Sequence, residues 1–376
     1  MAKKLLQKIG YMILAAFICA GFYSCSEDES ENGGGSSSPG TITAVGATDF
    51  TAYSMRGELN IRIKPTNADA KVSTDKFGFT EYEEISSGSI ESGDPLASAI
   101  TFKEVKQNED GSYMLVAAYD WTGIESKTAS CKITYAGTET SIPLTLECRD
   151  AIRLGCSPLA KGLKGRISAE AAPGEDALPE GLGVSKVQAS GAHATNVAFD
   201  IEGGIANMFV ELDDLFQLTS EEQTEGKASI PVEVTLTNGD ATFYVDGAIE
   251  VNPSYALEKA ALPEKSKWNI QDALDQLGVE YRLDTTPIEL DRLSYFISND
   301  NGPLITISQF GKPMFPAFGV EVTLNDEGAE VGRHVSFRIL GADKLAEGSY
   351  TFVIRMKKVI DASDNRYVDI VIPFTK

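Results

Sequence analysis

The stretch "ASIPVEVTLTNGDATFYVDG", residues 228–247, carries the clearest structural pattern in the chain. Apolar and polar residues alternate on both sides of Asn238-Gly239, which predicts a β-hairpin with a type I′ turn, because both central residues of that turn need positive φ. With this pair as the turn, Leu236 faces Ala241 and Val234 faces Phe243, so the two apolar faces match. The stretch therefore indicates an antiparallel sheet with one buried face.

The same alternation of period two recurs from residue 41 to the end of the chain. The apolar positions are Leu59, Ile61 and Ile63, then Cys131, Ile133 and Tyr135, then Ile142, Leu144, Leu146 and Cys148, and finally Tyr350, Phe352, Ile354 and Met356 answered by Val368, Ile370, Ile372 and Phe374. Ile-Pro pairs at 142–143, 230–231 and 372–373 place a proline on the polar face, where its missing N–H is tolerated at an edge or a bulge. This indicates either a repeated edge strand or a coincidence.

Cys131 and Cys148 share the apolar face of one predicted hairpin, opposite or diagonal to one another. They form either a disulfide or two small buried hydrophobic residues. Only Cys156 accompanies them in the body of the chain, so the sequence does not describe a disulfide scaffold.

Predicted helices are few and short. Residues 205–216 have apolar residues at helical spacing, and residues 266–278 predict a second helix that closes at Gly278. We therefore predict an all-β fold of tandem immunoglobulin-like β-sandwiches with few short helices. Boundaries near "ECRDAIRLGCSP" (147–158) and "VNPSYALEKAALPEKS" (251–266) give sandwich domains at 41–150, 151–254 and 255–376.

The N-terminal residues predict where the protein is located. Residues 1–24 combine three lysines with a short apolar run and end on Ser24 before Cys25, which resembles a bacterial lipoprotein signal peptide. The acidic run "SEDESE" (26–31) resembles the surface-export signal of lipoproteins in Bacteroidota. These resemblances imply lipidation at Cys25, localisation in the outer membrane and exposure to the cell exterior. The alternatives are an ordinary secretory signal and a solvated charge run.

Residues 25–40 form a tether in this reading. An acidic run followed by "NGGGSSSPG" cannot bury enough apolar surface to fold, so we expect a flexible coil. Fifteen such residues reach roughly 20 Å. The partner implied for this end of the chain is the outer membrane, bound through lipid on Cys25.

Net charge excludes one class of partner. The chain has 55 acidic and 33 basic residues, and removal of the leader leaves 30 basic ones, a net charge of about −25. No basic patch is present to neutralise phosphates, so we expect no nucleic acid partner.

No catalytic or metal-binding motif stands out, and we expect no cofactor, no metal and no enzymatic activity. The two histidines, His193 in a predicted loop and His334 in a predicted strand, match no zinc spacing. A pair of glycosidase carboxylates could only be recognised in three dimensions. Acid-rich segments at 298–303 and 361–369 suit turns better than a calcium loop.

Four aromatic residues are the candidates for ligand binding: Tyr119, Trp121, Trp268 and Phe315. Exposed in loops, they would stack on sugars or dock a partner. Buried, they would close the ends of sandwich cores.

The pattern of strands behind a lipidated cysteine resembles the immunoglobulin-like modules of Bacteroidota surface lipoproteins. The resemblance implies a non-catalytic binding or adhesion module. One alternative is a surface glycan-binding lipoprotein of a polysaccharide-uptake system, although two tryptophans are few for such sites. The other is a fimbrial or assembly subunit, which requires an edge strand open to exchange.

Overall fold

The computed structural model describes residues 38–84, 88–89, 98–124, 128–157, 159, 161, 163–205, 208–279, 293–299, 302–357 and 366–376. Residues 1–37, which include the predicted leader, Cys25 and most of the tether, lie outside this range. The segment from Ser38 to Lys376 forms one compact unit. In the described part of the chain, no helix is both long and apolar enough to cross a membrane.

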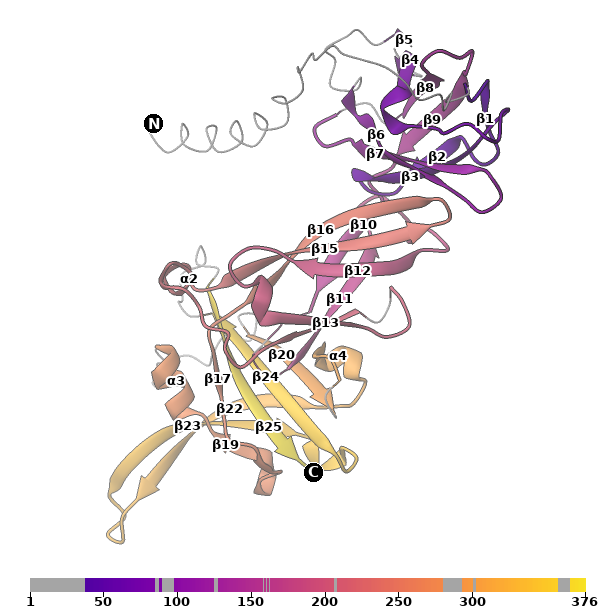
Figure 1. Cartoon of the computed structure of the whole chain (residues 1–376). Helices are drawn as coiled ribbons and strands as arrows, with labels where there is room; N and C mark the ends of the chain where they lie inside the picture. The colour runs from indigo at the N-terminus through magenta and orange to yellow at the C-terminus, as the bar shows by residue number, and fades with distance from the viewer. Residues whose placement is uncertain are drawn as a thin grey trace, which may run out of the picture. The chain divides into compact units, whose positions relative to one another are not determined.

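In the described residues, five sheets account for nearly all regular structure (Figure 1). Sheet A has the order β12-β15-β16-β3-β7-β6, with β1 also paired to β3. Its strands are β1 (Ile42–Ala44), β3 (Arg56–Pro65), β6 (Ile100–Gln107), β7 (Tyr113–Asp120), β12 (Gly183–Ala189), β15 (Ala228–Asn238) and β16 (Ala241–Val251). Sheet B contains β2 (Asp49–Ala52), β4 (Phe77–Glu84), β5 (Gly88–Ser89), β8 (Thr128–Tyr135) and β9 (Ile142–Cys148).

The other three sheets are formed by residues from Ile152 onward. Sheet C contains β10 (Ile152–Cys156), β11 (Lys164–Ala171), β13 (Val197–Ile201) and β14 (Met208–Leu212). Sheet D contains β17 (Ser254–Ala256), β18 (Ala260–Ala261), β20 (Leu293–Asn299), β21 (Ile305–Thr306), β24 (Ser349–Lys357) and β25 (Tyr367–Thr375). Sheet E has three strands, β19 (Lys267–Asn269), β23 (Glu330–Leu340) and β22 (Phe315–Leu324), in that order.

Apolar side chains pack between these sheets as sandwich cores. One continuous core unites residues of sheets A, B and C, and a second core joins sheets D and E, where the rings of Phe337 and Phe352 lie 5.4 Å apart. Leu59, Ile61 and Ile63 alternate inward on β3 as predicted, each fully buried. The predicted all-β class of tandem immunoglobulin-like sandwiches with few short helices is confirmed.

Sheet A runs through the first two sandwiches without a break. Strand β3 lies antiparallel to β16, with Leu59 opposite Ala241 and Arg56 opposite Tyr244. Sheet A therefore takes strands from both sides of the boundary near 147–158. The three domain ranges stay predictions.

The hairpin of residues 228–247 forms, but its predicted register is wrong by two residues. Asn238 pairs with Ala241, so Leu236 faces Phe243 and the turn residues are Gly239 and Asp240. Of the two, only Gly239 has positive φ (57°), which is the type II′ pattern. Because the shift is even, the same side chains still point inward.

The structure changes both helix predictions. Residues 208–212 are strand β14, in which Met208, Val210 and Leu212 are buried, so the helix predicted over 205–216 is wrong. Its apolar residues fit a period of two as well as 3.6. Within 266–278, helix α3 (Gln271–Leu277) ends at Gly278 as expected, whereas its first residues form β19. The other short helices are α2 (Ser220–Glu225), α4 (Ile307–Phe310) and the 3₁₀ turns Thr74–Lys76, Ala194–Asn196, Glu264–Ser266 and Ala342–Lys344.

The last hairpin has the predicted apolar faces paired with one another, with Tyr350 opposite Phe374 and Met356 opposite Val368. Its turn lies outside the described residues. The repeated edge strand suggested by the Ile-Pro pairs is wrong, because β9, β15 and β25 each have partners on both sides. Each proline instead lies where the partner strand on one side has ended or is interrupted. A missing N–H at such a position leaves no ladder hydrogen bond unmade.

Cys131 and Cys148 are both buried and form no disulfide. Cys131 lies opposite Leu144, not opposite or diagonal to Cys148. The interpretation as small buried hydrophobic residues is therefore confirmed.

Candidate functional site

Tyr119 and Trp121, at the end of β7, belong to the core. Tyr119 is 2% exposed and Trp121 is fully buried. The Trp121 backbone N–H donates to the Met55 carbonyl (2.7 Å). Gly57 makes room for the tyrosine ring, because a Cβ there would lie 2.4 Å from the Tyr119 hydroxyl oxygen. Burial also raises the pKa of Tyr119. Neither ring presents a face to a ligand, so their prediction as binding residues is wrong.

Trp268 is buried, whereas Phe315 is exposed. Trp268 on β19 is only 8% exposed, and its ring lies 5.4 Å from Phe374 and 6.5 Å from Phe337. Its predicted binding role is therefore wrong as well. Phe315, the first residue of β22, is 64% exposed. It is the one predicted aromatic that remains available to a partner.

Phe315 lies on a hairpin that exposes many large apolar side chains. Among the described residues, nine large apolar side chains are exposed, and six of them lie on the hairpin of β22 and β23. These six are Phe315, Val320, Val322, Leu324, Val331 and Leu340. We call Val320, Val322, Leu324 and Val331 the edge patch. In Figure 1 the tip of this hairpin extends away from the other strands of its sandwich.

The edge patch continues the core face of sheet E. Along β22, Phe318 is half-buried and packs 5.2 Å from Phe337, whereas the exposed fraction rises from 38% at Val320 through 45% at Val322 to 57% at Leu324. On the neighbouring strand, Val335 opposite Val320 is 1% exposed. The core therefore covers the hairpin as far as Phe318 and Val335 and leaves its tip, which includes Val331 of β23, uncovered.

The opposite face of the hairpin holds one charge cluster. Glu321 forms an ion pair with Lys267, and its carboxylate lies 3.6 Å from His334 Nε2 and 3.8 Å from Arg338. Glu321 is the only charged residue on β22. The strand thus carries no unpaired charge along its length.

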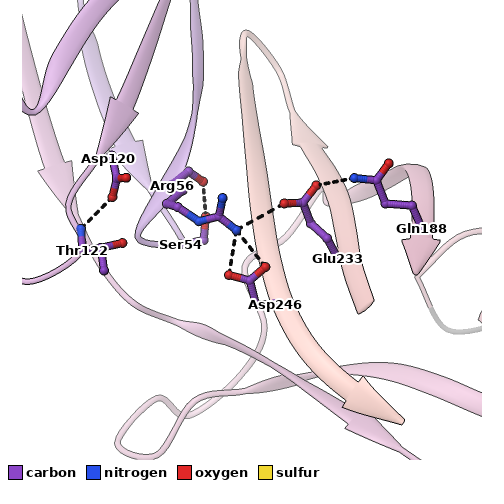
Figure 2. A network of polar contacts seen from close by, with 7 residues as sticks. All are labelled: Ser54, Arg56, Asp120, Thr122, Gln188, Glu233 and Asp246. Carbon is purple, nitrogen blue, oxygen red and sulfur yellow. Dashed lines mark hydrogen bonds and ion pairs between the residues drawn. The ribbon is translucent and has the colours of Figure 1, made fainter. Parts of the chain in front are cut away.

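A polar network joins the strands at which sheet A crosses from the first sandwich to the second (Figure 2). The Arg56 guanidinium donates to both carboxylate oxygens of Asp246 (2.7 Å each) and to Glu233 (3.2 Å), and the Gln188 amide donates to Glu233 (3.0 Å). Burial alone would lower the pKa of Arg56, but the two carboxylates outweigh it and the pKa is raised. Because every charge in the network has a partner, the network is suited to holding the strands together rather than to catalysis.

His193 is buried and His334 is half-buried. His193 precedes a 3₁₀ turn, is 7% exposed, lies 4.7 Å from the Phe216 ring and meets the Glu222 carboxylate at 2.8 Å. His334 lies on β23. Among the residues that the structure places, no three His, Cys, Asp or Glu side chains converge as a metal site would. The predicted turns at 298–303 and 361–369 lie partly outside the described residues.

Two polar grooves lie between sheet C and sheet D. The larger, about 390 Å³, is lined by Lys164, Glu211, Lys259, Ser298, Ser349 and Thr351 among others. The smaller, about 270 Å³, includes Cys156, Arg166, Glu170 and Gln309. Among the described residues, each groove is lined by a single acidic side chain, whereas a glycosidase needs two facing carboxyl groups. Burial, with Glu170 nearby, raises the pKa of the Cys156 thiol to about 11, so this cysteine stays protonated at neutral pH.

The edge patch is the feature that sequence reasoning missed. "FPAFGVEVTL" reads as an ordinary strand with Phe318, Val320 and Val322 on one face. Such a face is assigned to the core by default, and nothing local to the strand shows that the opposite sheet ends before covering it. The one signal available was the length of the hairpin relative to its short neighbour β19.

Comparisons with known proteins give only distant matches. No family model and no curated protein matches the chain. Among solved structures, the extracellular domain of protocadherin GammaB4 is 9% identical over 89% of this chain and 49% of its own, with a TM-score of 0.19. This chain thus spans about half of that protocadherin structure.

Two further solved structures match at the same level. The Escherichia coli adhesin FdeC is 10% identical over 89% of this chain and 96% of its own, with a TM-score of 0.19. An endo-fucoidan hydrolase of glycoside hydrolase family 107 is 10% identical over 90% of this chain and 44% of its own, with a TM-score of 0.20. Values this low carry no argument about function.

Proposed function

We propose that this protein is a non-catalytic binding module held on the outer surface of the outer membrane by lipid on Cys25. The observation that supports a binding role is the edge patch, since isolated apolar residues are common on surfaces but a contiguous set on one hairpin marks a contact site. The tether of residues 25–40 would hold this contact site away from the membrane.

The partner class favoured by the edge patch is a protein. Aliphatic side chains such as Val322 and Leu324 fit an apolar protein surface, whereas sugars stack on exposed aromatic rings. Tyr119, Trp121 and Trp268 are buried, so the glycan-binding alternative loses three of its four candidate residues. The assembly alternative gains support from the open strand β22.

The anchor is tested by expressing the full chain in a bacterium that exports surface lipoproteins. We expect a palmitate analogue to label the native chain but not Cys25→Ala, and protease added to intact cells to digest the body. An unlabelled native chain, or a body protected in intact cells, would contradict the anchored surface location.

The binding role is tested with the same cells. Polysaccharides, mucin glycans and purified proteins, including this chain, are presented to cells that display the native chain or Val322→Asp. We expect binding to protein that falls at least tenfold in Val322→Asp, with Leu215→Asp as the matched control because Leu215 is 80% exposed on another part of the surface. Saturable glycan binding that Val322→Asp leaves intact would overturn the assignment.

A further inference from the structure

Strand β22 is an edge strand with one hydrogen-bonding neighbour. It pairs with β23 along its whole length, and the described part of the chain places no strand on its other side. Alternate residues of this ten-residue edge therefore direct their backbone N–H and C=O groups outward, with no N–H at Pro316, which is the arrangement that accepts an added strand.

From this edge we propose that β22 pairs antiparallel with β22 of a second copy of the chain, about a twofold axis at Val320. Sheet E of one molecule then continues into sheet E of the next. This inference rests on the proposed binding function and names its partner.

Apolar complementarity supports a second copy as the occupant. With the axis at Val320, Val322 faces Phe318 of the other copy, and Leu324 faces Pro316. Since opposed residues of an antiparallel pair share a face, the apolar side chains of β22 from both copies form one strip, bordered on each β23 by the Arg333–Glu330 ion pair. The half-covered core face of each molecule is then extended by the other.

Charge selects the register of this pairing. The chain as a whole has a net charge of −22, so two copies repel one another over most of their surface. On β22 the one charge, Glu321, is already paired with Lys267 and faces Gly319 of the second copy in the proposed register. An axis at Glu321 would instead oppose two carboxylates, which is unfavourable.

Disulfide trapping on cells tests the pairing with the full chain. Opposed residues in an antiparallel pair have Cβ atoms about 5 Å apart, close enough for a disulfide after small adjustment. We expect Val320→Cys to form a covalent dimer on mild oxidation. Val322→Cys should stay monomeric alone, because its two copies lie roughly 13 Å apart, four residues along the strand. Coexpression of Val322→Cys with Phe318→Cys should restore the dimer.

Two controls set the background. The native chain reports on Cys131, Cys148 and Cys156, none of which forms a disulfide. Leu215→Cys reports on chance collisions between exposed thiols. We expect less than a tenth of the Val320→Cys dimer from either.

Three outcomes would overturn the inference. Digestion of Val320→Cys by external protease on the same cells, without any covalent dimer, would refute the second copy while the proposed surface location stands. Cross-linking to a different protein would assign the edge to another partner. Flotation of the lipid-free chain, carrying Cys25→Ala, with phosphatidylethanolamine–phosphatidylglycerol vesicles, lost in Val322→Asp, would assign the edge patch to lipid.

Discussion

The edge strands of sheets A and E differ in the features that protect an edge from pairing with another molecule. The outer strands of sheet A, β6 and β12, each contain a register shift, between Phe102 and Glu104 and between Val184 and Lys186. Strand β6 also places Lys103, Glu104 and Lys106 on its exposed surface. Bulges and charges of this kind keep an edge from pairing with another molecule.

Strand β22 lacks these protections over most of its length. Its one register shift lies at the tip, between Thr323 and Leu324, and its one charge is paired. Edge pairing with another molecule is therefore blocked in sheet A and left open in sheet E. Of these two sheets, sheet E is the one that combines an open edge with exposed aliphatic residues.

The largest expected effect separates buried from exposed aromatics. Trp121→Ala should lower the free energy of unfolding by about 3–5 kcal/mol, because a large core side chain is removed and a cavity remains. Phe315→Ala should change it by less than about 0.5 kcal/mol. Urea unfolding followed by far-UV circular dichroism measures both. Equal effects would contradict the placement of these two residues.

Removing the protection on β6 should convert it into a second open edge. Glu104 and Lys106 form an ion pair, so Glu104→Val with Lys106→Val removes both charges together. We expect self-association to rise at least tenfold, equivalent to about 1.4 kcal/mol, in sedimentation velocity. The matched Glu104→Gln with Lys106→Gln should leave it unchanged. Association that does not change in the valine variant would show that charge is not what blocks β6.

Arg56→Met tests whether the polar network holds the shared part of sheet A together. The guanidinium is one-third exposed, so the loss should be modest, about 1 kcal/mol, and smaller at high salt. Thermal unfolding at low and high ionic strength measures it. Arg62→Met, in an exposed pair with Asp110, is the matched control and should have a smaller effect. A larger loss of stability in Arg62→Met than in Arg56→Met would contradict the role of the polar network in holding sheet A together.

The smallest effect concerns acid. The pKa of Glu222 is lowered because its bonds to His193 and Thr219 outweigh its burial. A depressed folded-state pKa means that this stabilisation is complete above the unfolded-state pKa of about 4.3 and is lost as the pH falls through the folded value. Glu222→Gln should remove this part of the acid sensitivity in unfolding between pH 6 and 3. Glu221→Gln, exposed on the same helix, should retain it.

The fold was predictable where one face is buried and the alternation is long. Residues 228–247 and the hairpin of β24 and β25 form with the predicted faces inward, because a period of two leaves only one way to bury them. Short apolar runs were ambiguous, as in β14, where the same residues fit a helix. The turn at Gly239 shifted by one position because Gly239-Asp240 satisfies a type II′ turn as well as Asn238-Gly239 satisfies type I′.

The site was not predictable to the same degree. Tyr119 and Trp121 continue the spacing of two set by Tyr113, Leu115 and Ala117 on β7. The alternation of apolar residues could therefore have predicted that both are buried. Exposure of Val320, Val322 and Leu324 was not, since it depends on where sheet D ends relative to sheet E. Sequence patterns describe which face is apolar, whereas only tertiary packing decides whether that face is covered.

Hydrogen exchange of β22, measured on the mature lipid-free chain at low and high protein concentration, tests the open edge most directly. The account predicts that backbone amides within Phe315–Leu324 become protected at least tenfold as concentration rises, while β6 and β12 exchange at unchanged rates. Exchange in β22 that is independent of concentration, or protection that rises equally at all three edges, would contradict it.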